Sequence, residues 1–468
     1  MKRRDFIRKS SAALTAVAGA MILPSYVLGK SFGHVAPSDK VNLAVCGIGN
    51  RGGELLSSLY KTGLVNVVAL CDVDMGAPHT LENMNKFPNA KRFKDFREMF
   101  DKMGNQFEAV SVGTPDFSHF PITMLAMSQG KHVYVEKPMA HTFEEVELMM
   151  RGEKKYKVAC QMGNQGHSDE NYFQFKSWTE AGIIKDVTAI TAFMNNGRRW
   201  HGMKATDFLP PQPIPETLDW DKWLTTAEFK NYNKGYINGE WRSWFEFGNG
   251  ALGDWGAHII DTAHEFLHLG LPTEVNPIKM QGHSSFLFPQ GSTLVFKFPK
   301  RKDMPALDIT WYDGFNNQPT LPEFFGEYVR AKNIPPPTAA NKSTKRYPGK
   351  VIYSKELTFK GGSHGSTLEI IPAEKAKDLA SRLPFVPVSP SNHFANFLKA
   401  CKGEEKCRSS FEVAGPLCQV MALGVLAQRL NTRLVFDSNK NQITNSKVGN
   451  QLLVGPPPRK GWEQFYKM

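Results

Sequence analysis

The sequence predicts an α/β protein with two domains: an N-terminal doubly wound parallel sheet of the Rossmann type, then an α+β domain on a mostly antiparallel open sheet. Three observations predict this fold. A glycine-rich turn near residue 47 separates a short apolar strand from a helix. Strand and helix signals then alternate to about residue 160, as in βαβ units. Beyond residue 161, strand-like runs follow one another without regular helices between them.

The glycine-rich turn carries the first functional signal. The apolar run 41–46 stops at Gly47, and Gly47, Gly49 and Gly52 occupy the glycine positions of G-x-G-x-x-G. In a dinucleotide-binding turn the first glycine permits a tight bend, the second lets the backbone approach a pyrophosphate, and the third lets the helix pack closely on the strand. The helix N-terminus then offers N–H groups and the positive end of its dipole to the phosphates.

An acidic residue completes this signature. Asp72 lies 20 residues beyond Gly52, at the end of the next apolar run, where a carboxylate accepts hydrogen bonds from the adenosine ribose. A carboxylate there repels a 2′-phosphate, so we expect NAD rather than NADP as the cofactor. A glycine turn of purely structural use would not require the strand, the helix and the acid in these places.

The remaining elements follow from local patterns. Along the first domain we expect helices at 95–103, 119–129 and 142–155, and strands at 109–112 and 132–136. Thr142 and Glu145 form a capping box at the start of the last helix. In the second domain we expect strands at 187–193, 292–298 and 307–311, helices at 392–399 and 412–430, and loops in the proline-rich segments 209–215 and 335–337.

The chain therefore divides into five segments. They are an export signal (1–30), a linker (31–40), an NAD-binding Rossmann domain (41–160), a substrate-binding α+β domain (161–440) and a C-terminal tail (441–468). The 468 residues and 41% hydrophobic content suffice for two sizeable cores.

The first segment resembles a bacterial twin-arginine export signal. Arg3 and Arg4 precede an apolar run rich in small residues at 11–23, although Lys2 stands where the pattern prefers Ser or Thr. About 13 apolar residues are too few to span a bilayer comfortably. We expect export by the twin-arginine machinery to the periplasm or beyond, with an uncleaved amphipathic N-terminus or a membrane anchor as the alternative. We expect that no later segment is long and apolar enough to be a transmembrane helix.

The net charge of +12 does not indicate a nucleic-acid partner. Six basic residues and one acidic residue lie in the first 30 positions, and the other charges are scattered along the chain. The six cysteines are too few for a disulfide framework, and no Cys/His spacing predicts a metal site. Cys401 and Cys407 flank a short turn, where they either pair or stay free.

Two further motifs lie where parallel strands end. Thr114-Pro115-Asp116-Phe117-Ser118-His119 follows the strand at 109–112, and Glu136-Lys137-Pro138 follows the strand at 132–136. Open α/β sheets bind ligands at this carboxyl edge.

The glycine turn, T-P-x-x-x-H and E-K-P, in this order and spacing, resemble the glucose–fructose oxidoreductase, inositol dehydrogenase and MocA (Gfo/Idh/MocA) family. The resemblance extends from residue 41 to about residue 430. It implies that the E-K-P lysine lies beside the nicotinamide and the substrate, and that a D-x-x-x-H pair in the second domain completes the site. Asp254 and His258 supply that pair, and residues four apart share one face of a helix.

The predicted site contains three groups of residues. The catalytic residues are Lys137, Asp254 and His258. The cofactor-binding residues are Gly47, Gly49, Asn50, Arg51, Gly52, Asp72, Thr114, Pro115, His119, Glu136, Lys137 and Asn164, of which Asn164 rests on the resemblance and His119 is expected mainly to cap or pack. The substrate-binding residues are Lys137, Asn164, Arg198, Trp200, Trp255 and His258, with His167 as a weaker candidate.

Six of the nine tryptophans crowd between residues 200 and 255, beside several basic residues. Aromatic faces and charged donors around a cavity suit a sugar, whose ring offers C–H faces and hydroxyls. Packing in the core or at a subunit interface explains the same cluster equally well. For Trp255, the alternative to a substrate contact is that it anchors its own helix.

These features predict an NAD(P)-dependent oxidoreductase that moves a hydride between a sugar or polyol carbon and a nicotinamide. We expect His258 to take the hydroxyl proton, Asp254 to orient His258, and Lys137 to stabilise the alkoxide, with Lys137 as the alternative base. Outside the cytoplasm the cofactor must stay bound. The alternatives are a redox-neutral glycoside hydrolase or lyase and a carbohydrate-binding protein without activity. Family members are often homo-oligomers, which is an expectation by analogy here.

Overall fold

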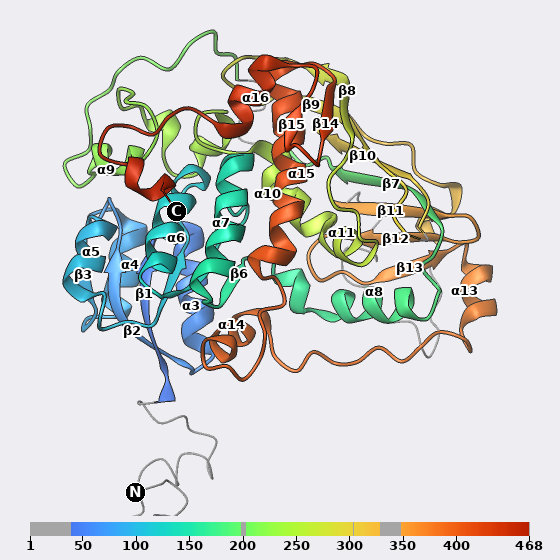
Figure 1. The fold of residues 1–468 in the computed structure, drawn as a ribbon, viewed down its shortest axis with the longest axis horizontal. Helices are drawn as coiled ribbons and strands as arrows, with labels where there is room; N and C mark the ends of the chain where they lie inside the picture. The colour runs from blue at the N-terminus through green and yellow to red at the C-terminus, as the bar shows by residue number, and fades with distance from the viewer. Residues whose placement is uncertain (1–38, 198–202, 303, 328–347, 468) are drawn as a thin grey trace, which may run out of the picture. The chain divides into compact units, whose positions relative to one another are not determined.

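The computed structural model describes residues 39–467, except for 198–202, 303 and 328–347. The predicted export signal therefore lies outside the described residues, as do Arg198, Trp200 and the proline-rich segment 335–337. Residues 41–468 form one compact unit. Within it, Figure 1 shows the first sheet in blue to teal, the second in green to red, and helix α15 running between them.

The first sheet has six parallel strands in the described part of the chain, in the order β3-β2-β1-β4-β5-β6. The strands are β1 (Val41–Cys46), β2 (Val65–Cys71), β3 (Lys91–Phe93), β4 (Ala109–Val112), β5 (His132–Val135) and β6 (Cys160–Met162). This order confirms the doubly wound Rossmann sheet. Its direction of winding reverses between β1 and β4, and dinucleotides bind at such a switch point.

Five helices pack against this sheet: α3 (Asn50–Lys61), α4 (Pro78–Lys86), α5 (Phe96–Met103), α6 (His119–Ser128) and α7 (Phe143–Tyr156). Local sequence explains where two of them begin. Asp95 accepts a hydrogen bond from the Arg97 N–H at the start of α5, 2.9 Å long. The predicted capping box of Thr142 and Glu145 is present at the start of α7.

The second sheet has nine strands among the described residues, in the order β13-β12-β11-β7-β10-β9-β8-β14-β15. They are β7 (Val187–Met194), β8 (Glu274–Gln281), β9 (Gly291–Phe298), β10 (Leu307–Asp313), β11 (Gly349–Ser354), β12 (Thr358–Gly362), β13 (Leu368–Ile371), β14 (Leu434–Asp437) and β15 (Gln442–Ile443). The β7–β10 pair is parallel and the other pairs are antiparallel. The expected mostly antiparallel sheet is confirmed.

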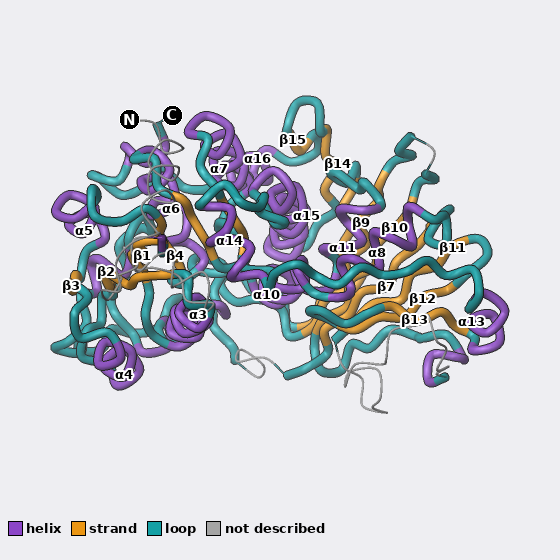
Figure 2. The backbone as a smooth tube through the Cα atoms, turned by 90° about the horizontal axis from the view of Figure 1, so that it is seen from below, coloured by secondary structure: helices purple, strands orange, loops and turns teal. Residues whose placement is uncertain are grey.

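The helices of the second half lie around and between the sheets (Figure 2). They are α8 (Glu170–Glu180), α9 (Trp220–Leu224), α10 (Gly250–Ile259), α11 (Asp261–Phe266), α13 (Ala373–Leu379), α14 (His393–Cys401), α15 (Phe411–Leu430) and α16 (Lys447–Val454). Helix α15 contacts α7 and α10 as well as β8 and β9, so it joins the two domains.

Helix α15 corrects one expectation. By length and composition it is the one helix in the described part of the chain that is able to cross a membrane, so the expectation that no later segment qualifies is wrong. In this structure 83% of its apolar window is buried inside the protein. Its apolar character is thus accounted for by the core that it fills.

The segment assigned above to a C-terminal tail is folded. Strand β15 extends the second sheet, and Trp462 and Phe465 pack against Phe96 of the first domain. The Tyr466 hydroxyl donates a 2.7 Å hydrogen bond to Glu145. The chain end therefore closes back on the Rossmann domain.

The cysteines are free in the described chain. Cys401 and Cys407, which were candidates for a disulfide, are unpaired. They pack against the apolar cluster beneath α3. Cys46, Cys71 and Cys160 are buried at strand ends, as expected, where they act as small apolar residues.

Candidate active site

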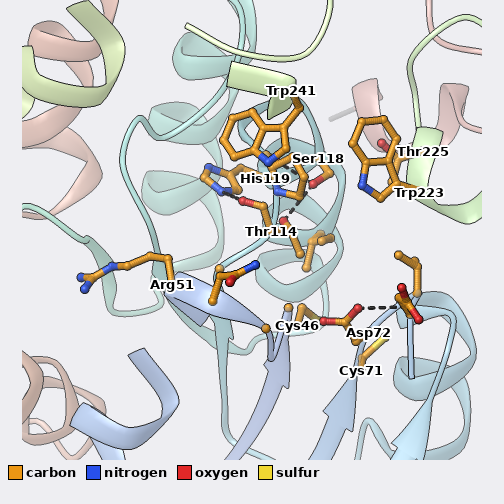
Figure 3. Close-up of a pocket in the computed structure, with 18 of the residues that line it drawn as sticks. Cys46, Arg51, Cys71, Asp72, Thr114, Ser118, His119, Trp223, Thr225 and Trp241 are labelled. Carbon is orange, nitrogen blue, oxygen red and sulfur yellow. Dashed lines mark hydrogen bonds between the residues drawn. The ribbon is translucent and has the colours of Figure 1, made fainter. Parts of the chain in front are cut away.

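A cavity of about 470 Å³ lies at the carboxyl edge of the first sheet. Figure 3 shows residues of the glycine turn, the end of β2, the T-P-x-x-x-H loop and two tryptophans around it. Ten predicted cofactor residues line it: Gly47, Gly49, Asn50, Arg51, Asp72, Thr114, Pro115, His119, Glu136 and Lys137. One continuous space therefore connects the glycine turn to the E-K-P lysine.

The glycine turn has the close packing that its motif predicts. Gly47 has a φ of +80°, which L side chains rarely adopt. A Cβ atom on Gly52 would lie 2.1 Å from the Gly47 carbonyl oxygen, so the first turn of α3 fits directly on the loop. Gly49 precedes α3, whose first turn carries no acidic residue. This helix N-terminus suits a pyrophosphate.

Asp72 is fixed at the end of β2 by two backbone donors. The Ile48 N–H donates to one carboxylate oxygen at 2.9 Å, and the Asp74 N–H donates to the other at 3.0 Å. Burial raises the pKa of Asp72, and these two hydrogen bonds oppose the shift. The carboxylate is thus held facing the cavity, where a ribose would lie. The His79 ring packs over Gly49 beside it, a neighbour that the sequence motif did not reveal.

Glu136 and Arg51 join β5 to α3. The Arg51 Nε donates to Glu136 at 3.0 Å, and Nη2 lies 2.8 Å from the same carboxylate oxygen. Glu136 is buried and Arg51 is 44% exposed. Both predicted cofactor residues therefore line the cavity; Arg51 engages Glu136 Oε1, while Oε2 is buried without a hydrogen-bond partner among the described residues.

His119 braces the two functional loops. Its Nδ1 lies 2.8 Å from the Pro138 carbonyl oxygen, and its Nε2 lies 2.8 Å from that of Thr114. Burial lowers the pKa of this histidine. The packing role expected for His119 fits these contacts, because both ring nitrogens face loop carbonyls.

Lys137 of the first domain contacts Asp254 of the second. Its ammonium donates to the Asp254 carbonyl oxygen at 2.9 Å and to the Asp254 carboxylate at 2.5 Å. Both side chains are nearly buried. The predicted lysine and aspartate thus come together across 117 residues of sequence. The Arg242 guanidinium approaches the same carboxylate oxygen, with its Nε 3.4 Å away.

His258 lies behind this pair, outside the lining of the cavity. Its Nδ1 is buried without a hydrogen-bond partner among the described residues, and its ring stacks on His364 with centroids 4.0 Å apart. Burial lowers the pKa of His258 well below its ordinary value, and the charge of Lys137 adds to the shift. The imidazole is therefore neutral and able to accept a proton.

This arrangement corrects the role expected for Asp254. We expected its carboxylate to orient His258, whereas it holds Lys137 and leaves the buried Nδ1 of the imidazole unpaired. His364 positions the histidine instead, and its own N–H donates to the His258 carbonyl oxygen at 2.9 Å. The glycine-rich run 361–365 around His364 was the signal that could have drawn attention to it. Trp255 packs edge-on against His364.

Asn164 belongs to a buried polar network and does not line the described cavity. The Ser409 hydroxyl donates to its side-chain oxygen, and its amide nitrogen lies 3.4 Å from Asp261. His167 lies between Asp261 at 3.0 Å and Glu265 at 2.5 Å. These two carboxylates outweigh burial and raise the pKa of His167 to about 9. The expected contact of Asn164 with the nicotinamide is not visible in this arrangement.

The protonated His167 predicts a pH dependence of stability. The folded pKa of about 9 exceeds the ordinary histidine pKa of 6.5, so the stabilisation is fully present below pH 6.5 and is lost as pH rises through 9. The difference corresponds to about 3 kcal/mol. We expect the melting temperature of the wild type to fall over this range, and that of His167→Gln to start lower and fall less. The exposed His283→Gln serves as control, and equal slopes in all three proteins would contradict the assignment.

Packing explains most of the tryptophan cluster. Trp220 and Trp223 stack with centroids 4.6 Å apart, and Trp244 is fully buried in the same aromatic cluster. Trp223 and Trp241 also line the cavity. The cluster is therefore chiefly a core, with two members exposing an edge to the candidate site.

Among the lining residues that were not predicted as site residues, Asp116 and Arg242 lie closest to the candidate chemistry. Asp116 lies within the T-P-x-x-x-H motif and Arg242 lies within the tryptophan cluster, so both were in view in the sequence. Burial raises the pKa of Asp116 to about 6, and the nearby charge of Arg242 opposes the shift. Sequence spacing could not show that these two side chains approach each other across 126 positions.

Comparisons with known proteins agree with this site. Residues 41–164 match the oxidoreductase family with an NAD-binding Rossmann fold (GFO_IDH_MocA), and residues 174–284 match the C-terminal alpha/beta domain of the same family. Since both domains match it, the chain belongs to the Gfo/Idh/MocA oxidoreductase family.

Among similar curated proteins, an inositol 2-dehydrogenase of Salmonella paratyphi B is 28% identical over 193 residues, covering 40% of this chain and 55% of that protein. A glycosyl hydrolase family 109 protein of Solibacter usitatus is 29% identical over 209 residues, covering 42% and 46%. The chain thus spans about half the length of these relatives.

Among solved structures, the WlbA dehydrogenase from Bordetella pertussis, in complex with NADH and UDP-GlcNAcA, has a TM-score of 0.57 at 14% identity, covering 85% of this chain and 99% of that one. At this identity the likeness concerns the fold.

Proposed function

We propose that the protein is an NAD-dependent oxidoreductase that transfers a hydride between a sugar or polyol carbon and a tightly bound nicotinamide cofactor. The observation that carries this proposal is the single cavity joining the glycine turn and Asp72 to Lys137. At its far end Lys137 is held by Asp254, with the neutral His258 behind. The dinucleotide site and Lys137 therefore share one space, and His258 lies directly behind it.

The residues present fit an adenine dinucleotide. Gly47 and Gly52 pack without room for side chains, the N-terminus of α3 faces the cavity, and Asp72 is aimed at a ribose. The Asp72 carboxylate disfavours a 2′-phosphate, which supports NAD over NADP. When bound, the nicotinamide supplies a hydride acceptor or donor.

The chain's own residues supply the acid–base chemistry. We assign the proton of a substrate hydroxyl to His258, because its imidazole is neutral and its Nδ1 has no hydrogen-bond partner among the described residues, although burial weakens it as a base. The Lys137 ammonium stabilises the alkoxide that develops, while the Asp254 carboxylate keeps the ammonium in place. Lys137 as the base remains the alternative assignment.

A clasp over the cofactor groove supports tight binding. The clasp consists of residues 217–225. It packs against the loop that follows Asp72. The Asp219 N–H donates to the Val73 carbonyl oxygen at 2.9 Å, and the Thr217 hydroxyl donates to Asp74 at 2.7 Å. Arg459 fixes the far end of the clasp through Asp221 at 2.6 Å. A cofactor leaving the groove would have to break such contacts.

Retention of the cofactor would suit an exported enzyme, because the twin-arginine route carries folded proteins and no dependable NAD pool exists outside the cytoplasm. The signal at residues 1–30 supports this location. A retained cofactor also permits the redox-neutral hydrolase or lyase, in which the hydride returns to the same sugar.

The function is tested on protein purified without added nucleotide. We expect denaturation, but not dialysis, to release NAD, and we expect sugars or inositols to reduce the bound cofactor. Aryl glycosides without added cofactor separate the alternatives, because aglycone release without net reduced nicotinamide identifies the hydrolase or lyase. Sugar binding without any turnover would favour a binding protein and overturn the enzymatic proposal.

A further inference from the structure

Asp116 and Arg242 form a second polar pair in the wall of the cavity, next to Lys137 and Asp254. Asp116 is 1% exposed, and its Oδ2 accepts a 3.1 Å hydrogen bond from the Asn249 N–H. Arg242 comes from the second domain, and its guanidinium lies 4.3 Å from the centre of the Trp241 ring. Both residues line the cavity where a substrate would lie, and each side chain also contacts a neighbour outside the pair.

The pair is close but not hydrogen-bonded. The Arg242 Nη2 lies 3.7 Å from Asp116 Oδ1, beyond the usual range for an N–H···O hydrogen bond. Asp116 Oδ1 and Arg242 Nε are buried without hydrogen-bond partners in the described part of the chain. Buried polar atoms left unpaired cost free energy, so such atoms in a cavity wall call for a ligand. One hydroxyl can bridge Arg242 Nη2 and Asp116 Oδ1, which are 3.7 Å apart, by accepting from the guanidinium and donating to Oδ1.

The charges favour a neutral ligand. Two cations, Lys137 and Arg242, face two carboxylates, Asp116 and Asp254, so the group is balanced when both acids are ionised. An added carboxylate would meet two carboxylates already in place, whereas a hydroxyl group adds a donor and an acceptor without charge. A polyol hydroxyl therefore fits this pair better than an acidic sugar.

The position of the pair identifies which hydroxyl it would hold. Lys137 Nζ and Arg242 Nε approach the same oxygen of Asp254, at 2.5 and 3.4 Å. The two donors are therefore neighbours around one atom. An oxygen on the carbon next to the reacting one would reach Arg242 while the reacting oxygen reaches Lys137.

We propose that Asp116 and Arg242 form a specificity subsite that binds the hydroxyl adjacent to the reacting carbon of a neutral polyol or sugar. This inference rests on the proposed function, because the reacting oxygen is placed at Lys137. The pair recognises a vicinal diol, with Arg242 donating and Asp116 accepting. It excludes substrates that lack this hydroxyl or replace it with a carboxylate.

The test measures binding of three probes to NADH-loaded protein by calorimetry: D-glucose, 2-deoxy-D-glucose and D-glucuronate, with myo-inositol as a second neutral diol. The variants are Asp116→Asn, which keeps the size of the side chain, and Arg242→Gln. The control is Arg151→Gln, a residue that is 58% exposed and pairs with Glu147. NADH affinity is measured for each protein beforehand, because it reports on the cofactor site alone.

We expect wild type and control to bind at least one neutral diol, and both variants to bind it about 10- to 100-fold more weakly with unchanged NADH affinity. If glucose is the diol bound and its C1 or C3 is the reacting carbon, the loss of its 2-hydroxyl should weaken binding to wild type and make no further difference in the variants. Unchanged diol affinity in both variants, tighter binding of glucuronate by wild type, or no diol binding to the NADH-loaded wild type would overturn the subsite. Failure of wild type to bind NADH would instead defeat the proposed function.

Discussion

Replacing Lys137 by methionine is expected to slow hydride transfer by about 10²- to 10³-fold, the loss typical for removing one donor from a developing oxyanion. Methionine keeps most of the volume of the lysine stem and removes the ammonium. The measurement is the formation of reduced nicotinamide in a single turnover, with sugar or inositol mixed into protein that already carries its cofactor.

Folding and cofactor binding should survive this change. Asp254 loses its hydrogen bonds from Lys137 but retains Arg242 3.4 Å away, so its buried charge keeps a cationic neighbour. Lys154→Met is a matched control, because that exposed lysine lies 3.4 Å from Glu412 on the protein surface. A Lys137→Met protein that turned over at the wild-type rate would remove Lys137 from the mechanism.

Replacing Gly52 by alanine is expected to abolish NAD binding. The new Cβ would lie 2.1 Å from the Gly47 carbonyl oxygen and 3.1 Å from that of Gly113, and backbone atoms cannot move aside as a flexible side chain can. The first turn of α3 would have to shift away from the loop that faces the pyrophosphate. We expect at least a 100-fold loss of NADH affinity and a loss of about 1–3 kcal/mol in stability.

The control for this change is Gly326→Ala, where an added Cβ meets nothing within 4 Å and the backbone is not in the left-handed region. NADH affinity is followed by calorimetry and stability by thermal unfolding. Wild-type affinity in Gly52→Ala would show that the cofactor does not lie on this turn.

The sequence predicted the parts of the site whose positions depend on motif spacing within one or two neighbouring elements. Gly47, Gly52 and Asp72 are tied to the ends of successive elements, and their spacing reflects the length of one βαβ unit. Lys137 follows the end of β5, and His119 begins α6 after the loop that follows β4, so their place at the sheet edge follows from topology. Ten predicted cofactor residues line the cavity for this reason.

The parts that the sequence could not predict depend on contacts between distant segments. The helical spacing of Asp254 and His258 places both on α10, but it does not reveal that Asp254 binds Lys137 while His258 stacks on His364. Asn164 follows a buried strand as expected, yet Ser409 on a distant segment draws its side chain into a network beside the cavity. Residue spacing along one element carries no information about which other element approaches it.

Composition alone left the character of two segments open. The run 411–430 is apolar enough to cross a membrane, and only its neighbours show that it is a core helix. Most of the tryptophans near residue 220 pack on one another, although the same residues would suit a sugar site. Apolar and aromatic content predicts that a segment will be buried. It does not show whether protein, membrane or ligand buries it.

The central claim is that an adenine dinucleotide lies across the edge of the first sheet with its nicotinamide near Lys137. Native mass spectrometry of the intact protein, purified without added nucleotide, tests it most directly. We predict a bound mass equal to that of NAD in the wild type and in Lys137→Met, and its absence in Gly52→Ala. A wild-type protein that remains without nucleotide even after incubation with NADH, or equal occupancy in Gly52→Ala, would contradict the account.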